Sequence, residues 1–256
     1  MKITQFSFFR KLLRHAARPG SSAVGRFMLW GMNRGHSPVY EFGLSHVELP
    51  RGGRILDAGC GGGELLRRMA RRAPDAMLAG IDISPASVEA TRQRNRRAIE
   101  AGRMEVKEGA VEALPWPDAT FDLVTACETV YFWDPATAFR EVARVLKPGG
   151  SFAVFLEAAD PVAARIWTDA LPAMHVRTVE ELSSLLAAAG FAVRETEVVV
   201  VTVPDRPGGM ADLMERFDKA GVDIQYAYAY APGAGDKAVL VFKFSDNEKA
   251  LTALAG

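Results

Sequence analysis

From Arg54 onward, short apolar runs alternate with longer segments whose apolar residues recur at helical spacing. Short apolar runs bounded by turn residues are typical of strands, and the amphipathic segments are typical of helices. The predicted strands are 54–58, 77–83, 104–107, 121–127 and 151–157, with a further strand from Phe191. The predicted helices are 64–72, 85 to about 101, 135–146 and 179–189. Because crossovers between successive parallel strands are right-handed, this order predicts a doubly wound α/β domain with a largely parallel sheet.

The pattern changes after Val201. It predicts a strand at 198–203, a turn at 204–209, a helix at 210–220, strands at 224–231 and 237–244, and a short helix from Asn247. This β-α-β-β-α order is most of a small ferredoxin-like α+β unit, which lacks its last strand. We therefore expect two domains, 1–197 and 198–256, with 1–45 as a helical lid on the first.

A glycine-rich segment lies between the first predicted strand and the first predicted helix. Asp57 ends the strand, and Gly59, Gly61 and Gly63 follow at alternate positions. Glycine adopts positive φ without strain and has no Cβ, so this segment indicates close approach of the backbone to a ligand, rather than a flexible surface turn. At the end of the second strand, Asp82 can accept both hydroxyl groups of a ribose, which implies a nucleoside.

The neighbours of these glycines narrow the class of nucleoside. Glu64 stands where a dinucleotide fingerprint has its third glycine, and no Lys-Ser/Thr pair follows as in a triphosphate loop. An acid beside the loop suits a cationic ligand better than a pyrophosphate.

Composition excludes several other classes. Lys+Arg and Asp+Glu number 31 each, so the net charge gives no argument for nucleic acid, and no apolar run is long enough for a membrane span. Two cysteines in strand-like contexts indicate free thiols and a cytoplasmic location. The segment before Glu41 has seven basic residues and no acid. Its aromatic residues, Phe6 to Phe9, fit a helix that packs on its own domain better than one on an anionic membrane.

Four segments carry a resemblance to a known family. They read Asp57-Ala-Gly-Cys-Gly-Gly-Gly, Gly80-Ile-Asp-Ile-Ser, Leu114-Pro-Trp-Pro-Asp-Ala-Thr-Phe-Asp-Leu-Val and Arg144-Val-Leu-Lys-Pro-Gly-Gly. Together, over about residues 19 to 191, they resemble the class I S-adenosylmethionine-dependent methyltransferases, with their Rossmann-like fold. Thr125-Ala-Cys-Glu-Thr-Val-Tyr-Phe-Trp133 is similar to a bacterial subgroup of small-molecule methyltransferases, as is the segment from Arg26 to His36.

The resemblance implies S-adenosylmethionine as cofactor, S-adenosylhomocysteine as product and a small-molecule methyl acceptor. It assigns the cofactor to a set of residues along the carboxyl ends of the strands. The set comprises Asp57, Gly59, Cys60, Gly61 and Gly63 near the methionine part, Asp82 on the ribose, Ile83, Ala110 and Val111 on the adenine, and Cys127 near the methyl group. Many relatives bind the adenine amine with an acid where this chain has Ala110, so backbone groups would replace it here.

Methyl transfer from a sulfonium needs alignment more than a strong base. If the acceptor must lose a proton, Glu128 is the first candidate, with Tyr131, Tyr40 and His36 behind it. An equal alternative makes Glu128 a structural carboxylate that accepts loop amides. Trp133, Phe132 and Tyr131 either line a substrate pocket or pack on the next helix. Arg92, Arg94, Arg96 and Arg97 fit a solvated face better than a nucleic-acid patch. We expect no metal ion.

The tail from 199 to 256 carries a second resemblance. Val203-Pro-Asp-Arg-Pro-Gly-Gly-Met210 leads into a helix, and Gly221-Val-Asp-Ile follows it. These segments look like an ACT domain, a regulatory module that often binds amino acids. The resemblance implies an amino-acid effector or a homodimer, with the missing strand supplied by residues 2–9 or by a partner subunit. The leading hypothesis is a regulated small-molecule methyltransferase, and the alternative is a non-catalytic amino-acid sensor on a methyltransferase-like scaffold.

Overall fold

The structure is a computed structural model of the 256-residue chain. It describes residues 31, 36–157, 159, 161–162, 164–194, 199–204, 208–230 and 237–255. The chain divides into two compact units, Met1–Val193 and Arg194–Gly256, and each is treated separately below. The aromatic and basic segment near the start of the chain, including residues 2–9, lies outside the described residues.

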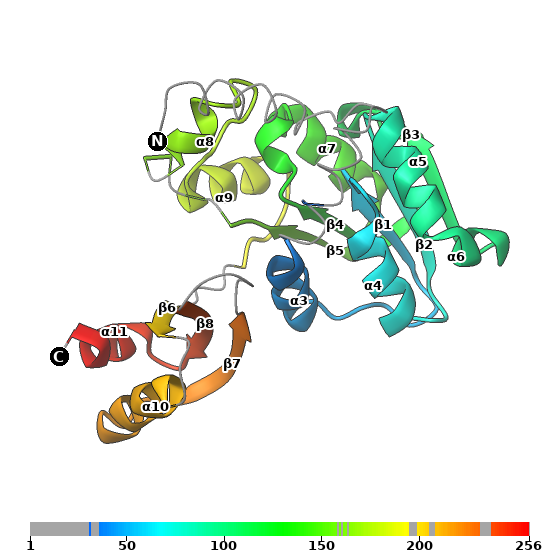
Figure 1. Cartoon of the computed structure of the whole chain (residues 1–256). Coiled ribbons are helices and arrows are strands. Elements are labelled where there is room, and N and C mark those ends of the chain that lie inside the picture. Colours follow the sequence, from blue (N-terminus) through cyan, green and yellow to red (C-terminus); the bar gives the residue numbers. More distant parts are fainter. Residues whose placement is uncertain are drawn as a thin grey trace, which may run out of the picture. The chain divides into compact units, whose positions relative to one another are not determined.

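A five-stranded parallel sheet forms the centre of the first unit (Figure 1). Its strands are β1 (Arg54–Ala58), β2 (Met77–Asp82), β3 (Met104–Glu108), β4 (Phe121–Cys127) and β5 (Leu146–Phe155). They lie in the order β3-β2-β1-β4-β5. β2 and β3 therefore follow β1 on one side of the sheet, and β4 and β5 are added on the other side of β1. This order makes a switch point between β1 and β4, where open α/β sheets bind their ligands.

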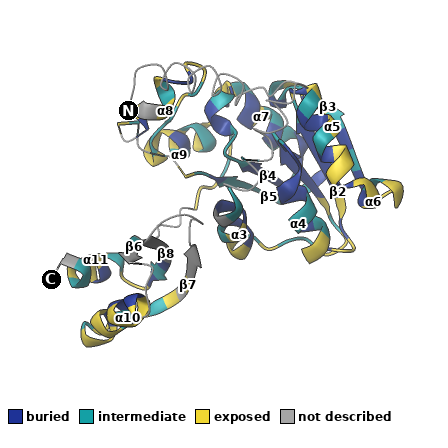
Figure 2. Ribbon diagram, viewed as in Figure 1, coloured by how far each residue is buried: buried dark blue, intermediate teal, exposed yellow. Residues whose placement is uncertain are grey.

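Helices cover both faces of this sheet. One face packs against α3 (Ser37–His46), α4 (Glu64–Arg72), α5 (Pro85–Arg94) and α6 (Arg96–Glu100). The other packs against α7 (Pro135–Val145) and α9 (Val179–Ala188). Neighbouring residues of a strand point to opposite faces, and Ile55 and Leu56 are both fully buried. Burial on both faces explains why β1, β2 and β4 read as continuous apolar runs, and Figure 2 shows the centre of the sheet buried beneath helices with exposed outer surfaces.

The elements differ from the predicted ones in three places. The helix predicted from 85 to about 101 is split at Asn95, whose side-chain amide donates to the carbonyl oxygens of Gly63 (3.0 Å) and Thr91 (3.1 Å). Residues 191–194 form no strand, and the continuation at 195–198 lies outside the described residues. In β5, Leu146 already pairs with Phe121, and the pairing resumes at Ser151 after a register shift.

Two of the four motif segments are joined at the amino end of β4. Arg144 donates to the carbonyl oxygens of Leu114 (3.0 Å) and Trp116 (2.9 Å) and to the carboxylate of Asp118 (2.8 Å). Asp122 accepts the Arg54 amide and the Lys147 ammonium, both at 2.8 Å, and these two donors hold the pKa of Asp122 below its usual range. These residues brace the sheet at the edge opposite the switch point.

The second unit is a small α+β fold. Its elements are β6 (Val199–Pro204), α10 (Gly209–Lys219), β7 (Ile224–Tyr230), β8 (Lys237–Phe244) and α11 (Asn247–Ala255). The strands pair antiparallel in the order β6-β8-β7. Phe217 of α10 packs edge-on against Phe242 and Phe244 of β8, with ring centroids 5.3 and 4.8 Å apart. Within the described residues the sheet has three strands, which leaves β6 at an edge, as expected for a ferredoxin-like unit without its last strand.

The bracing role of Arg144 can be tested by Arg144→Ala. The variant leaves two backbone carbonyls and a carboxylate without their donor, so we expect a loss of roughly 2 kcal/mol in the free energy of unfolding. Urea denaturation measures it. Arg140→Ala, an exposed arginine of the same helix, is the control and should change stability by less than about 0.5 kcal/mol. Equal effects in the two variants would contradict the bracing role.

Candidate functional site

The loop after β1 is fixed to the end of β2 by its own backbone. The amides of Gly59 and Cys60 both donate to the Ile81 carbonyl, at 2.8 and 2.9 Å. The φ angles of Gly59, Gly61 and Gly63 are +76°, +52° and +73°, values that side chains rarely tolerate. The alternating glycines therefore permit a tight loop at the carboxyl end of the sheet.

The three glycines differ in what surrounds them. A Cβ on Gly59 would lie 2.2 Å from Thr129 Oγ1, and a Cβ on Gly63 would lie 2.7 Å from Asn95 Nδ2. A Cβ on Gly61 would meet nothing within 4 Å. Gly59 and Gly63 thus allow close packing within the protein, whereas Gly61 faces open space.

Asp82 connects this loop to the next helix. Its Oδ2 accepts the Gly61 amide and its Oδ1 accepts the Ser84 amide, each at 2.9 Å. A carboxylate offers about four lone-pair directions, so it can accept further hydrogen bonds from a ligand. The next side chain, Ile83, is 47% exposed although it is apolar. An acid beside an exposed apolar surface suits a nucleoside, which has both hydroxyl groups and a flat base.

Asp57 lies buried beneath the loop on β1. Burial raises the pKa of its carboxyl to about 7, while the hydrogen bond from Thr125 Oγ1 (2.9 Å) opposes this shift and the charge of Asp82 adds to it. A cation bound nearby would favour the ionised carboxylate and lower that pKa. The buried acid therefore suits a positively charged ligand better than an anionic one.

The remaining predicted cofactor residues contribute in different ways. Cys60 is buried with its sulfur 3.7 Å from Thr91 Oγ1, and burial raises the pKa of its thiol well above the usual value. Only its backbone can meet a ligand in the loop. Ala110 is half-buried and precedes the short 3-10 helix Val111–Ala113, whose first amides have no partner within the helix. Cys127 is half-buried at the end of β4.

Glu128 follows β4 with a φ of +56°, an unusual value for a residue other than glycine. Its amide donates to the Phe155 carbonyl (3.0 Å), and its Oε1 accepts the Tyr131 hydroxyl (3.1 Å) and the Glu157 amide. Burial raises the pKa of its carboxyl to about 7. Glu128 thus accepts a loop amide, as the structural interpretation expects, and also has a pKa suited to receiving a proton near neutral pH.

The aromatic candidates are mainly buried. Tyr131 is 2% exposed and directs its hydroxyl at Glu128, so it positions that carboxylate. Trp133 is 8% exposed and packs edge-on against Phe139, so packing on the next helix is the correct interpretation for this residue. Tyr40 is also buried, with Arg68 over its ring at 5.7 Å.

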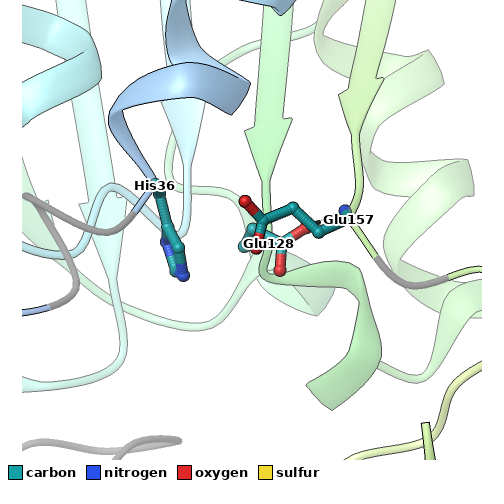
Figure 3. Close-up of side chains that lie close together, drawn as sticks. All are labelled: His36, Glu128 and Glu157. Atoms are coloured by element: carbon teal, nitrogen blue, oxygen red, sulfur yellow. Dashed lines mark hydrogen bonds between the residues drawn. The ribbon is translucent and has the colours of Figure 1, made fainter. Parts of the chain in front are cut away.

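His36 lies beside Glu128 and a third group, Glu157, which the sequence did not single out (Figure 3). The three come from separate parts of the chain, and nothing in their spacing signals that they meet. They meet because the residue before α3 and the residues after β4 and β5 all lie at the carboxyl edge of the sheet.

Glu64 and two arginines of α5 form hydrogen bonds within the protein. Glu64 is buried and accepts from Arg67, Arg68 and Arg94 at 2.6 to 3.0 Å. Arg94 also donates to the Gly62 carbonyl (2.7 Å), and Arg92 donates to the Val106 carbonyl (2.7 Å). Both arginines are exposed, as the predicted solvated face requires, and these hydrogen bonds also fasten α5 to the loop and to β3.

Two family models match parts of the chain, and the second match begins within the first unit. Residues 56–154 match the family model described as a methyltransferase domain, and residues 174–254 match one described as an ACT domain pair. A probable S-adenosylmethionine-dependent methyltransferase of Mycolicibacterium smegmatis is 32% identical over 213 residues, which cover 81% of this chain and 75% of that protein. The chain belongs to the S-adenosylmethionine-dependent methyltransferases, and S-adenosylmethionine is its cofactor.

Other relatives match over a smaller part of their length. The 27-O-demethylrifamycin SV methyltransferase of Amycolatopsis mediterranei is 36% identical over 60% of this chain and 59% of its own. The ubiquinone/menaquinone biosynthesis C-methyltransferase UbiE of Geobacter sulfurreducens is 38% identical over 45% of each chain. This chain thus spans about half the length of these two relatives.

Solved structures confirm the Rossmann-like fold. The YcgJ protein of Bacillus subtilis has a TM-score of 0.54 and 23% identity, covering 82% of this chain and 98% of its own. A putative methyltransferase of Haloferax volcanii, in complex with its Trm112 activator, has a TM-score of 0.57 and 18% identity, covering 83% and 93%. The described helices include none that is both long and apolar enough to cross a membrane.

The raised pKa of Asp57 predicts how Asp57→Asn changes stability with pH. The carboxyl has a pKa of about 7 in the folded protein and about 4 in the unfolded chain, so burying its charge costs nothing at low pH and most above pH 7. Asn keeps an oxygen for Thr125 and removes the charge. Urea denaturation measures the free energy of unfolding of the variant and of the unchanged protein. The difference, variant minus unchanged protein, should rise from pH 5 to pH 8.

Asp122→Asn is the matched control for this measurement. The pKa of Asp122 is lowered, so its charge contributes stability at both pH 5 and pH 8, and the variant should be destabilised about equally at both. A difference between Asp57→Asn and the unchanged protein that stays constant from pH 5 to pH 8 would contradict the account of Asp57.

Proposed function

We propose that this chain transfers the methyl group of S-adenosylmethionine to a small molecule and releases S-adenosylhomocysteine. The observation that carries the proposal is the open space at Gly61, which lies at the switch point between Asp82 and the end of β4. The relatives named above for rifamycin and quinone methylation support a small-molecule acceptor. The intact loop argues against the alternative of a non-catalytic amino-acid sensor.

We assign the parts of the cofactor to the residues that fit them. Asp82 would accept the ribose hydroxyls, exposed Ile83 would lie against the adenine, and the backbone of Ala110 and Val111 would meet the edge of the base. Asp57 and the loop residues Gly59, Cys60, Gly61 and Gly63 would surround the methionine part. The charge of Asp57 suits its positive groups.

Glu128 and Cys127 would face the methyl group from the other side of the switch point. When bound, the cofactor supplies a methyl group already activated on a sulfonium, so the protein mainly aligns the acceptor. The Glu128 carboxyl, with a pKa of about 7, would receive a proton from the acceptor, and the Tyr131 hydroxyl would hold it in place.

The domain assignment follows the two resemblances. We propose a methyltransferase domain over 1–197, with 1–45 as its lid, and an ACT-like domain over 198–256. Helix α3, within the proposed lid, packs closely on β5, since a Cβ on Gly43 would lie 2.6 Å from the Phe155 ring. Part of the lid is therefore integral to the sheet's cover.

The ACT-like domain would regulate the enzyme or join two copies of it. The β6 edge supports pairing with a further strand, from a partner subunit or from this chain, and the family match supports an amino-acid effector. Cys60 and Cys127 are both free thiols, which supports a cytoplasmic enzyme. The contacts of Arg92 and Arg94 with the protein support the absence of a nucleic-acid partner.

Gly61→Val tests the cofactor site by isothermal titration with S-adenosylhomocysteine. The valine side chain would fill the open space, so we expect affinity to fall at least 100-fold. Gly102→Val is the matched control, because Gly102 also has a positive φ (+68°) and open surroundings, but lies in the turn before β3, at the opposite end of the sheet. Both variants carry the same backbone strain, so melting temperatures should fall together while only Gly61→Val loses binding.

Two results would contradict the proposal. Equal affinity of the Gly61→Val and Gly102→Val variants for S-adenosylhomocysteine would show that the loop is not part of the binding site. If the unchanged protein gave no heat of binding with either S-adenosylmethionine or S-adenosylhomocysteine, the proposed methyltransferase activity would be contradicted.

A further inference from the structure

Three side chains with metal-binding atoms converge beside the proposed acceptor site. His36 precedes α3, Glu128 follows β4 and Glu157 lies two residues beyond β5 (Figure 3). One ligand atom from each, an imidazole nitrogen and two carboxylate oxygens, lies within 4.8 Å of the other two. The cluster therefore joins three elements at one point of the sheet edge.

The two carboxylates are held together by the backbone of their strands. Cys127 and Phe155 are partners in the β4–β5 register, and the Glu128 amide donates to the Phe155 carbonyl at 3.0 Å. The Glu157 amide in turn donates to Glu128 Oε1, which also accepts the Tyr131 hydroxyl. Both donors use one oxygen of Glu128, and among the described residues none donates to the other oxygen.

Among the described residues, no lysine or arginine compensates these two acids. Within the part of the chain that the structure describes, neither Glu128 nor Glu157 forms an ion pair with a lysine or arginine. An imidazole next to two carboxylates that have no lysine or arginine partner among the described residues is a donor set that binds a positive ion.

We propose that His36, Glu128 and Glu157 bind a divalent transition-metal ion. Bonds of about 2.0–2.2 Å from one ion to nitrogen and oxygen place neighbouring ligand atoms about 3 to 4 Å apart, so small side-chain rotations suffice to close the set. A mixed imidazole and carboxylate set suits Mn²⁺, Fe²⁺ or Zn²⁺, and three protein ligands leave positions open for others. This site departs from the expectation of no metal ion.

The ion would define the class of acceptor, and this step rests on the proposed function. An acceptor hydroxyl that completes the coordination would lose its proton to bulk water, because a bound cation lowers the pKa of an oxygen ligand. The oxygen would then form a bond to the methyl carbon as the carbon–sulfur bond breaks, with the electron pair left on the sulfur. The ion would replace the proton on Glu128, and the acceptor would be an oxygen nucleophile.

Titration of the chelator-treated, full-length protein with Mn²⁺, followed by the electron paramagnetic resonance signal of the free ion, tests the site. We expect one Mn²⁺ per chain, displaced by excess Zn²⁺. His36→Ala and Glu157→Gln should each weaken Mn²⁺ binding at least tenfold. Glu157→Gln keeps the backbone amide that Glu128 accepts, so it removes a ligand without removing this hydrogen bond. Glu100→Gln, an exposed glutamate of α6, is the control and should bind Mn²⁺ unchanged.

Titration of the same samples with S-adenosylhomocysteine separates this proposal from the proposed function. Unchanged S-adenosylhomocysteine affinity in Glu157→Gln, with weakened Mn²⁺ binding, supports the metal site and shows that the variant is folded. Mn²⁺ binding that does not saturate at one ion per chain, or that is equal in Glu157→Gln and Glu100→Gln, overturns the metal site and leaves the cofactor site standing. Loss of S-adenosylhomocysteine binding in the unchanged protein instead overturns the proposed function.

Discussion

The hydrogen bond between the Gly61 amide and the Asp82 carboxylate is the contact on which the ligand edge of this sheet depends. At 2.9 Å it joins the loop after β1 to the end of β2, and the other oxygen of Asp82 accepts the amide of Ser84. Ser84 in turn caps α5, since its hydroxyl accepts the Ser87 amide at 3.2 Å. One carboxylate therefore holds together the loop after β1, the end of β2 and the start of α5. The surroundings of Gly61 stay open.

Several acidic residues lie at the carboxyl edge of the sheet, although the formal net charge of the whole chain is zero. Asp57 and Glu128 lie on opposite sides of the switch point, and burial raises the pKa of each to about 7. Glu157, which is exposed, lies next to Glu128. Carboxylates gathered in this way are stabilised by positive charge, either from a sulfonium nucleoside near Asp57 or from a metal ion near Glu128. The same electrostatic condition thus supports both proposals.

The sequence predicted β1, β2 and β4 within a residue because burial on both faces makes their apolar runs continuous, and it predicted β3 within a residue from its alternating apolar positions. It also predicted the glycine loop, since positive φ and close approach leave a direct signature in residue type. The split at Asn95 was missed because it depends on a side chain that reaches the Gly63 carbonyl, a contact that helical periodicity does not record. The proximity of His36, Glu128 and Glu157 was missed for a similar reason, since it arises only when β4 pairs with β5 and α3 packs on β5.

A crystal structure of the protein with S-adenosylhomocysteine tests the central claim most directly. The account predicts that the Asp82 carboxylate accepts the ribose hydroxyls, that the adenine lies on Ile83, and that the thioether sulfur faces Glu128 across the open side of Gly61. A nucleoside bound elsewhere, with Gly61 and Asp82 making no contact to it, would contradict the account.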